Sequence, residues 1–174
     1  RSRVLPSLCH DHVDGQCIQA HDRRHQGDAL AGFELIDAGF DEVGALADAF
    51  NRPQARLAEG QKLAPFVHAM MDISDGLLID AERMATASRI GIEIDLACIP
   101  LSPAYVSYRT DSLESRMQAA SWGDDYELLF CAPASARIPV DATAVGRVIS
   151  GGGLTLRNGD EPVKLPPTLG YQHH

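Results

Sequence analysis

Two acidic residues with two other residues between them occur in the segment Asp72-Ile73-Ser74-Asp75-Gly76. Carboxylate oxygens are the ligands that a hard divalent cation prefers, so Asp72 and Asp75 are candidate metal ligands. Ser74 adds a hydroxyl group, and the start of a helix would offer free N–H groups to a phosphate oxygen. Gly76 would let a ligand approach the backbone closely. The structural alternative is that Ser74 or Asp75 simply caps the helix that follows.

A second acidic segment, Gly123-Asp124-Asp125-Tyr126-Glu127, leads into the apolar run Leu128-Leu129-Phe130. Three carboxylates at the mouth of a strand could hold a metal ion or accept hydrogen bonds from a ligand. The structural alternative is a solvated polar loop that ends the preceding helix. The residue types alone leave both interpretations open.

Composition limits the classes of protein to which the chain can belong. Its 174 residues are 45% hydrophobic and carry a formal net charge of −9, which indicates one globular domain. No apolar run approaches the roughly 20 residues of a membrane-spanning helix, so we expect no membrane partner. The acidic balance argues against nucleic-acid binding, which needs a basic face. Four cysteines are sparse for an oxidised scaffold and favour the cytoplasm, with Cys98 and Cys131 as buried thiols.

The elements that must position the two acidic segments follow from hydrophobic periodicity. Helices are expected over 29–40, 43–50, 54–63, 77–91 and 111–120, with Asp111 capping the last of them and Gly91 ending the fourth. Short strands are expected over 70–73, 92–96, 126–132 and 144–149. Gly151-Gly152-Gly153 predicts a hairpin between the last of these strands and residues 154–156. Pro100 and Pro103 are expected to bracket a loop. Strands that alternate with helices indicate an α/β or α+β layered fold.

Taken together, the two acidic segments resemble the corresponding motifs of thiamine-monophosphate kinases, in the same order and at similar spacing. Other parts of the chain agree with this resemblance, namely Arg52-Pro53-Gln54-Ala55-Arg56-Leu57, Glu93-Ile94-Asp95-Leu96, Pro100-Leu101-Ser102-Pro103, Val145-Gly146-Arg147-Val148 and Gly170-Tyr171-Gln172-His173. That family belongs to a superfamily with aminoimidazole-ribotide synthetase, whose members pair an N-terminal domain with a C-terminal α/β domain. The resemblance implies the C-terminal domain, a mixed sheet packed with helices.

The resemblance also implies an activity, which is Mg²⁺-dependent phosphoryl transfer from ATP to thiamine monophosphate, giving thiamine diphosphate. Such chemistry depends on positioning and charge neutralisation more than on covalent catalysis. When the roles of the family's residues are transferred one by one, Asp72 and Asp75 would be Mg²⁺ ligands, and Ser74 and Gly76 would bind ATP. Asp124 and Tyr171 would contact the thiamine moiety, and an aromatic ring beside a cationic thiazolium is physically reasonable. No catalytic residue is assigned, and a homodimer is left open.

The chain departs from the family pattern in three places. Trp122 stands where the family usually has glycine, and Asp124 is one methylene shorter than the usual glutamate. The family's N-terminal domain, with several aspartates and much of the ATP pocket, has no counterpart here. We therefore expect the isolated chain to hold only part of a site.

Residues 1–26 do not resemble the family, and the resemblance covers residues 27–174. We interpret residues 1–26 as an atypical leader, either without order or produced by a frameshift. Codons for Thr-Ile-Gly-Asp, shifted by one base, can read His-Asp-Arg-Arg, as at His21-Asp22-Arg23-Arg24. The nucleotide sequence tests this hypothesis.

Three alternatives stay open at this point. The first is another superfamily member, of the hydrogenase maturation factor or selenophosphate synthetase type. The second is a non-catalytic remnant domain that binds a ligand weakly or associates with a kinase domain. The third is an N-terminal zinc module, for which the leader supplies Cys9, His10, His12, Cys17, His21 and His25. Their spacing matches no familiar zinc pattern.

Overall fold

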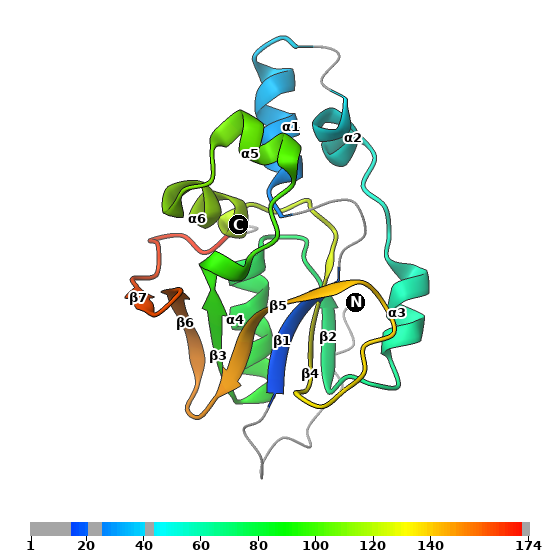
Figure 1. Ribbon diagram of the computed structural model, residues 1–174, viewed down its shortest axis with the longest axis vertical. Coiled ribbons are helices and arrows are strands. Elements are labelled where there is room, and N and C mark those ends of the chain that lie inside the picture. Colours follow the sequence, from blue (N-terminus) through cyan, green and yellow to red (C-terminus); the bar gives the residue numbers. More distant parts are fainter. Residues whose placement is uncertain (1–14, 21–25, 41–43, 172–174) are drawn as a thin grey trace.

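The protein is described by a computed structural model that covers residues 15–20, 26–40 and 44–171. Seven strands form one sheet, in the order β2-β4-β1-β5-β3-β6-β7 (Figure 1). The strands are β1 (Gly15–Ala20), β2 (Ala69–Asp72), β3 (Gly91–Asp95), β4 (Leu128–Pro133), β5 (Ala142–Ile149), β6 (Gly153–Asn158) and β7 (Glu161–Val163). The helices are α1 (Asp28–Asp37), α2 (Ala45–Asn51), α3 (Leu57–Leu63), α4 (Leu77–Ser88), α5 (Pro103–Arg109) and α6 (Leu113–Ser121), with a short 3₁₀ turn, η1 (Leu96–Cys98).

The sheet is mixed, as expected, because β3 and β6 run parallel while the other neighbouring strands run antiparallel. The predicted hairpin between residues 144–149 and 154–156 is wrong. β3 lies between β5 and β6, so these two strands do not pair with each other. The glycine turn at Gly151–Gly153 instead carries the chain across β3, and the hairpin of this region is β6–β7.

β1 comes from the stretch that the sequence interpretation assigned to the leader. It pairs antiparallel with both β4 and β5, and Cys17 lies opposite Cys131 in the register. Cys17 and Ile18 are buried in the core. The described domain therefore reaches back to Gly15 and does not start at Gly27. The frameshift hypothesis stays a prediction, and residues 1–14 and 21–25 lie outside the described residues.

One helix, α4, covers a face of the sheet, while α1, α2, α5 and α6 gather at one end of it (Figure 1). Leu77, Leu78 and Met84 of α4 join Ile92 and Ile94 of β3 in the largest buried cluster. The helix ends at Ser88 because Arg89 takes the left-handed conformation, with φ 55°. Gly91 was predicted to end this helix but is already the first residue of β3.

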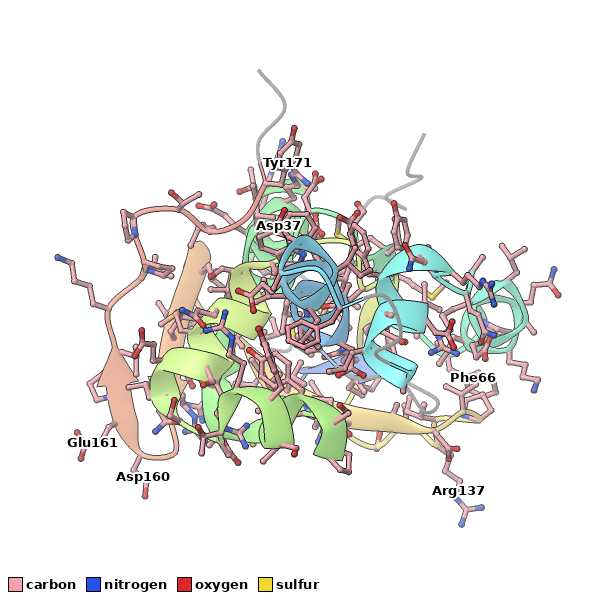
Figure 2. All side chains as sticks on the ribbon, turned by 90° about the horizontal axis from the view of Figure 1, so that it is seen from above. Asp37, Phe66, Arg137, Asp160, Glu161 and Tyr171 are labelled. Atoms are coloured by element: carbon pink, nitrogen blue, oxygen red, sulfur yellow. The ribbon has the colours of Figure 1, made fainter. Side chains whose placement is uncertain are left out.

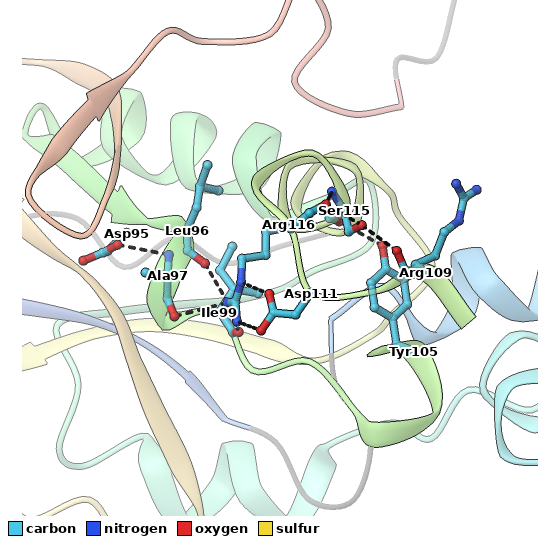
Figure 3. A network of polar contacts seen from close by, with 10 residues as sticks. Asp95, Leu96, Ala97, Ile99, Tyr105, Arg109, Asp111, Ser115 and Arg116 are labelled. Atoms are coloured by element: carbon cyan, nitrogen blue, oxygen red, sulfur yellow. Dashed lines mark hydrogen bonds and ion pairs between the residues drawn. The ribbon is translucent and has the colours of Figure 1, made fainter. Parts of the chain in front are cut away.

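The loop after β3 is held to α6 by a network of polar contacts (Figure 3). The Arg116 guanidinium donates to the carbonyl oxygens of Leu96, Ala97 and Ile99, and it also pairs with Asp111. Ser112 caps α6, so the prediction that Asp111 would do so is wrong. The network fixes the position of α6, whose last residue precedes Trp122.

The predicted loop between Pro100 and Pro103 is confirmed, and the helix α5, which was not predicted, begins at Pro103 itself. Ser102 caps α5 by accepting a hydrogen bond from the Tyr105 N–H group, and Pro103 occupies the first turn, where its missing N–H costs nothing. Tyr105 is fully buried, and its hydroxyl group donates to the carbonyl of Ser115. This contact joins α5 to α6.

Of the three cysteines in the described residues, two are buried and one is exposed. Cys131 is buried as predicted, with its sulfur 3.3 Å from that of Cys17, but Cys98 is exposed because it lies in the surface turn η1. The described part of the chain contains no helix that combines the length and the apolar character needed to cross a bilayer.

Candidate functional site

A cavity of about 520 Å³ lies where the two predicted acidic segments meet the C-terminal segment. Its lining residues come from three stretches that are distant in sequence, namely Ser74 and Asp75, then Ser121, Trp122, Gly123, Asp124 and Tyr126, then Gly170 and Tyr171. Four of the predicted site residues, Ser74, Asp75, Asp124 and Tyr171, are therefore brought together. Figure 2 shows Tyr171 at the outer end of the C-terminal segment, and its side chain is 63% exposed.

Backbone hydrogen bonds hold the three stretches against one another. The Asp124 N–H group donates to the Ser74 carbonyl at 2.9 Å, and the Tyr126 N–H group donates to the Ile73 carbonyl at 2.9 Å. The Tyr171 N–H group donates to the Asp75 carbonyl at 2.8 Å. The walls of the cavity are thus fixed by main-chain contacts, which do not depend on the side chains that face a ligand.

Glycines allow these backbones to approach so closely. A Cβ atom on Gly123 would lie 2.4 Å from the Ser74 carbonyl oxygen, and one on Gly170 would lie 2.4 Å from the Asp75 carbonyl oxygen. Gly76 has φ 128°, and its Cβ would lie 3.0 Å from the Ser121 carbonyl oxygen. The closest neighbour of Gly76 is therefore the end of α6, and its predicted contact with a nucleotide stays a prediction.

The turn between β2 and α4 is organised by Asp80, which sequence reasoning missed. Its carboxylate is fully buried and accepts hydrogen bonds from the N–H groups of Ser74 and Asp75, at 3.0 and 3.1 Å. Gly76 occupies the N-cap position with no side-chain cap, so the structural alternative of a Ser74 or Asp75 cap is wrong. Burial raises the pKa of Asp80, while the backbone N–H groups and Arg83 oppose that rise.

Arg83, also missed, ties Asp75 to the helix. Its guanidinium lies 2.5 Å from a carboxylate oxygen of Asp75 and 2.8 Å from one of Asp80. The side chain of Asp75 thus already has a cationic neighbour. A metal ion bound to this carboxylate would have to displace the Arg83 guanidinium or share the carboxylate with it. The spacing of Asp80 and Arg83, three residues apart on one helix face, was the signal that could have found this pair.

The second acidic segment alternates between the cavity and the interior. Asp124 and Tyr126 line the cavity, and both have positive φ, at 66° and 53°. Residues held in this sparsely populated region are concentrated at functional sites. Asp125 and Glu127 point inward instead and are buried. Only one of the three predicted carboxylates, that of Asp124, therefore lies in the cavity wall.

The two buried carboxylates have structural partners. Asp125 accepts hydrogen bonds from the N–H groups of Gly27 and Ala29 at the start of α1. Burial raises the pKa of Asp125 well above its ordinary value, although those two N–H groups oppose the rise. Glu127 forms a bidentate ion pair with Arg56, whose guanidinium nitrogens Nη2 and Nε lie 2.6 and 3.0 Å from the two carboxylate oxygens. These contacts connect the cavity segment to α1 and α3.

The chemical character of the cavity is aromatic and acidic. Trp122, Tyr126 and Tyr171 supply rings, Asp75 and Asp124 supply carboxylates, and none of the described lining residues is basic. Rings and carboxylates attract a flat cation, because the face of a ring carries partial negative charge. A phosphate group would find no cationic partner among these lining residues.

The predicted metal ligands are not gathered into a complete site. Asp72 is exposed at the end of β2 and is absent from the cavity lining, while Asp75 is paired with Arg83. Within residues 15–20, 26–40 and 44–171, no group of three or more His, Cys, Asp or Glu side chains could hold a metal ion. Of the zinc alternative, only Cys17 is described, and it is buried in β1; its other residues lie outside the described part.

Curated relatives are thiamine-monophosphate kinases. The protein of that name from Rhodopirellula baltica is 39% identical over 113 residues, which is 60% of this chain and 36% of the relative. The crystal structure of thiamine monophosphate kinase from Aquifex aeolicus is 31% identical, with a TM-score of 0.75, and covers 88% of this chain and 52% of that one. The chain thus spans about half the length of the relatives that it matches, or less.

Two further structures are similar to this chain. AaThiL complexed with AMPPCP and TMP has a TM-score of 0.77 and 30% identity, covering 92% of this chain and 52% of that one. HypE from E. coli, a hydrogenase maturation protein, has a TM-score of 0.65 but only 18% identity, so it shows a shared fold alone. The relatives therefore favour the thiamine kinases over the hydrogenase maturation alternative.

A family model covers most of the chain. The model of "AIR synthase related protein, C-terminal domain" matches residues 24–158. This range includes two of the three stretches that line the cavity, and the C-terminal stretch lies outside it. The mixed sheet packed with helices agrees with the fold that the sequence resemblance implied. The chain therefore belongs to the AIR synthase related proteins and carries their C-terminal domain.

Proposed function

We propose that this chain serves phosphoryl transfer from ATP to thiamine monophosphate, and that its cavity holds the cationic end of the thiamine substrate. The observation that carries this proposal is the cavity itself, in which aromatic rings and carboxylates meet with no basic described residue among them. The curated relatives named thiamine-monophosphate kinase support the choice of reaction.

The proposed roles of the residues follow from their chemistry. Asp124 would accept a hydrogen bond from the substrate or neutralise its positive charge, since its carboxylate is held by a strained backbone at the cavity wall. Tyr171 would lie against the thiazolium ring. Because the cavity lining is not basic, the phosphate of the substrate would extend away from the cavity toward ATP.

In the transfer, an oxygen of the thiamine-bound phosphate attacks the γ-phosphorus of ATP, and the bond to the bridging oxygen of ADP breaks. This step needs alignment and charge neutralisation rather than a covalent enzyme intermediate. Ser74 would position a phosphate oxygen of ATP by hydrogen bonding. The full site for ATP would need residues beyond the described ones.

Magnesium fits this site only as an ion that is held jointly by the protein and by substrate phosphates. Mg²⁺ is usually held by one or two carboxylates together with substrate phosphates, and Asp72 and Asp75 would supply such carboxylates. When bound, the ion would neutralise the phosphate charges. The reaction would take place in the cytoplasm, which the free thiols of Cys17 and Cys131 are compatible with.

The direct test is calorimetric titration of the purified chain with thiamine monophosphate, followed by an assay for thiamine diphosphate with ATP and MgCl₂. We expect saturable binding of thiamine monophosphate, and a Kd at least tenfold weaker for Asp124→Asn, because a charged hydrogen bond is lost. Asp160→Asn, on the β6–β7 turn, is the matched control and should bind normally.

The assay also separates the alternatives. Binding without turnover identifies the chain as the acceptor-binding part of a kinase site. Absence of binding to both thiamine and thiamine monophosphate at millimolar concentration contradicts the proposed function and favours a remnant domain.

A further inference from the structure

Trp122 is the single tryptophan of the chain, and it lies in the wall of the cavity. It directly follows the last residue of α6, and its N–H group donates to the carbonyl of Gln118, so the backbone of the residue is fixed by the helix end. Thiamine-monophosphate kinases, by resemblance, have glycine at this position. A large ring there changes what the cavity can accept.

The indole of Trp122 packs against a second aromatic ring, which contacts a third. The ring of Phe33, on α1, stacks on it with centroids 5.6 Å apart and an interplanar angle of 28°. Phe33 in turn contacts Phe50, on α2, at 5.5 Å. The indole is therefore positioned by two helices that contribute nothing else to the cavity lining, which gives it a defined orientation before a ligand arrives.

The indole can contact a ligand through its ring but not through its N–H group. Within the described residues, Nε1 of Trp122 is buried, with almost no accessible surface, and has no hydrogen-bond partner. An acceptor on a ligand in the cavity therefore cannot reach this atom while the side chain keeps its position. The ring, which belongs to the cavity lining, is the part of Trp122 that can recognise a flat heteroaromatic ligand.

The charges beside the indole define the class of ligand further. Asp75 and Asp124 supply negative charge to the cavity, and no described lining residue supplies positive charge. We propose that Trp122 is a specificity-determining residue, whose ring stacks on the cationic heteroaromatic ring of the substrate. This inference rests on the proposed function and deepens it by naming a contact residue particular to this chain.

The single tryptophan makes the first experiment direct. Its fluorescence is followed while the chain is titrated with thiamine, thiamine monophosphate or inorganic phosphate. Both thiamine compounds should change the emission with similar half-saturation concentrations, because they share the cationic ring. Inorganic phosphate should leave the emission unchanged.

Substitution then tests the contact itself, with binding measured by calorimetry. Trp122→Leu removes the ring and should weaken thiamine binding about tenfold, whereas Trp122→Phe keeps a smaller ring and should weaken it about threefold. Phe66→Leu, an exposed aromatic position after α3 that is labelled in Figure 2 and absent from the cavity lining, is the matched control. Circular dichroism must show that each variant is folded.

The outcomes separate this inference from the proposed function. If wild type and Trp122→Leu bind thiamine equally well, the role of Trp122 is wrong while the proposed function stands. If wild type binds neither thiamine nor thiamine monophosphate, both proposals fail. If Trp122→Leu unfolds, the folded Trp122→Phe variant decides, and unchanged affinity in it overturns the inference.

Discussion

Asp124 and Asp125 are neighbours in the chain, yet they lie in opposite environments. The positive φ of Asp124 and Tyr126 turns these two residues toward the cavity, while Asp125 and Glu127 enter the interior. The alternation explains how one short segment can both face a ligand and anchor the fold. Asp125 secures α1, and Glu127 secures the start of α3.

At this scale, close backbone approach makes Gly123 sensitive to substitution. In Gly123→Ala, the added Cβ would lie 2.4 Å from the Ser74 carbonyl oxygen. We expect overpacking to lower the free energy of unfolding by about 1–3 kcal/mol, as measured by urea denaturation. Gly152→Ala is the control, since nothing lies within 4 Å of its Cβ, and should change stability by less than about 0.5 kcal/mol. Equal effects in the two variants would contradict this account.

The sequence identified residues that line the cavity better than the residues that support them. Ser74, Asp75 and Asp124 stood out through residue type and spacing, and Tyr171 through the resemblance, because a motif preserves the order of residue types along the chain. Asp80 did not, because its role depends on a side chain that reaches back to two N–H groups, which residue type alone does not reveal.

At the scale of elements, buried ion pairs and helix caps set how helices join the sheet. Arg56 is the residue that precedes α3, and Glu127 precedes β4; their side chains are 4% and 1% exposed. Removing one partner of such a pair leaves an uncompensated charge in a place with little water. The pair therefore holds α3 at the edge of the sheet.

The Arg56–Glu127 pair leads to a double-mutant prediction. Arg56→Met should lower the free energy of unfolding by about 3–5 kcal/mol, because the buried Glu127 carboxylate would lose its ion pair with the guanidinium. The double variant Arg56→Met with Glu127→Leu should lose less than Arg56→Met alone. Urea denaturation of both variants and of wild type measures the difference. A double variant that is the least stable of the three would disprove this explanation.

The β6–β7 hairpin is fastened to β3 by Asp95, and this contact predicts a pH dependence. Burial raises the pKa of Asp95, but the Gly159 N–H group and Arg157 outweigh it, so that the net shift is downward. A lowered native pKa means that the stabilisation is present above the unfolded pKa of about 3.9 and is lost as pH falls through the native pKa. Asp95→Asn should therefore be less stable than wild type at pH 7.

Thermal unfolding at several pH values checks this prediction. The difference in Tm between wild type and Asp95→Asn should shrink as pH falls below about 4. Asp160→Asn, on the exposed turn of the same hairpin, is the control. A difference that stays constant from pH 7 to pH 3 would show that the charge of Asp95 is not the cause.

Element types were predicted well where the hydrophobic periodicity was long, as for α4. Strand pairing was predicted poorly, because it depends on strands that are distant in sequence. The missed pairing of β5 with β3 illustrates this limit, because a glycine turn between two apolar runs has the same local sequence whether or not a third strand separates them. α5 was missed because Pro103 was used only to mark the end of a loop, although proline is also favoured in the first turn of a helix.

At the scale of the whole molecule, β1 decides whether the sheet is continuous. It lies between β4 and β5 and pairs with both, so its removal would split the sheet into a β2–β4 pair and a β5-β3-β6-β7 part, with β4 and β5 each losing one of their two partners. Sequence reasoning did not assign β1, because Gly15–Ala20 is short and alternates only weakly. Its strand character comes from the two partners that enclose it.

A truncation tests this role of β1. A chain that starts at Gly27 should fail to give a cooperative thermal transition, whereas a chain that starts at Gly15 retains every described strand and should unfold cooperatively. Circular dichroism and amide dispersion in NMR spectra provide the measurement. Cooperative unfolding of the shorter chain at the Tm of the longer one would show that β1 is dispensable.

The position of β1 also has a consequence during synthesis. Its partner β4 follows more than a hundred residues later, since Cys17 faces Cys131, and β5 follows later still. At the usual rate of translation, β1 leaves the ribosome roughly ten seconds before either partner exists. Pairing over such a separation is slow to form, so the sheet can close only after nearly the whole chain has emerged. Until then this early strand is available to chaperones and to neighbouring nascent chains.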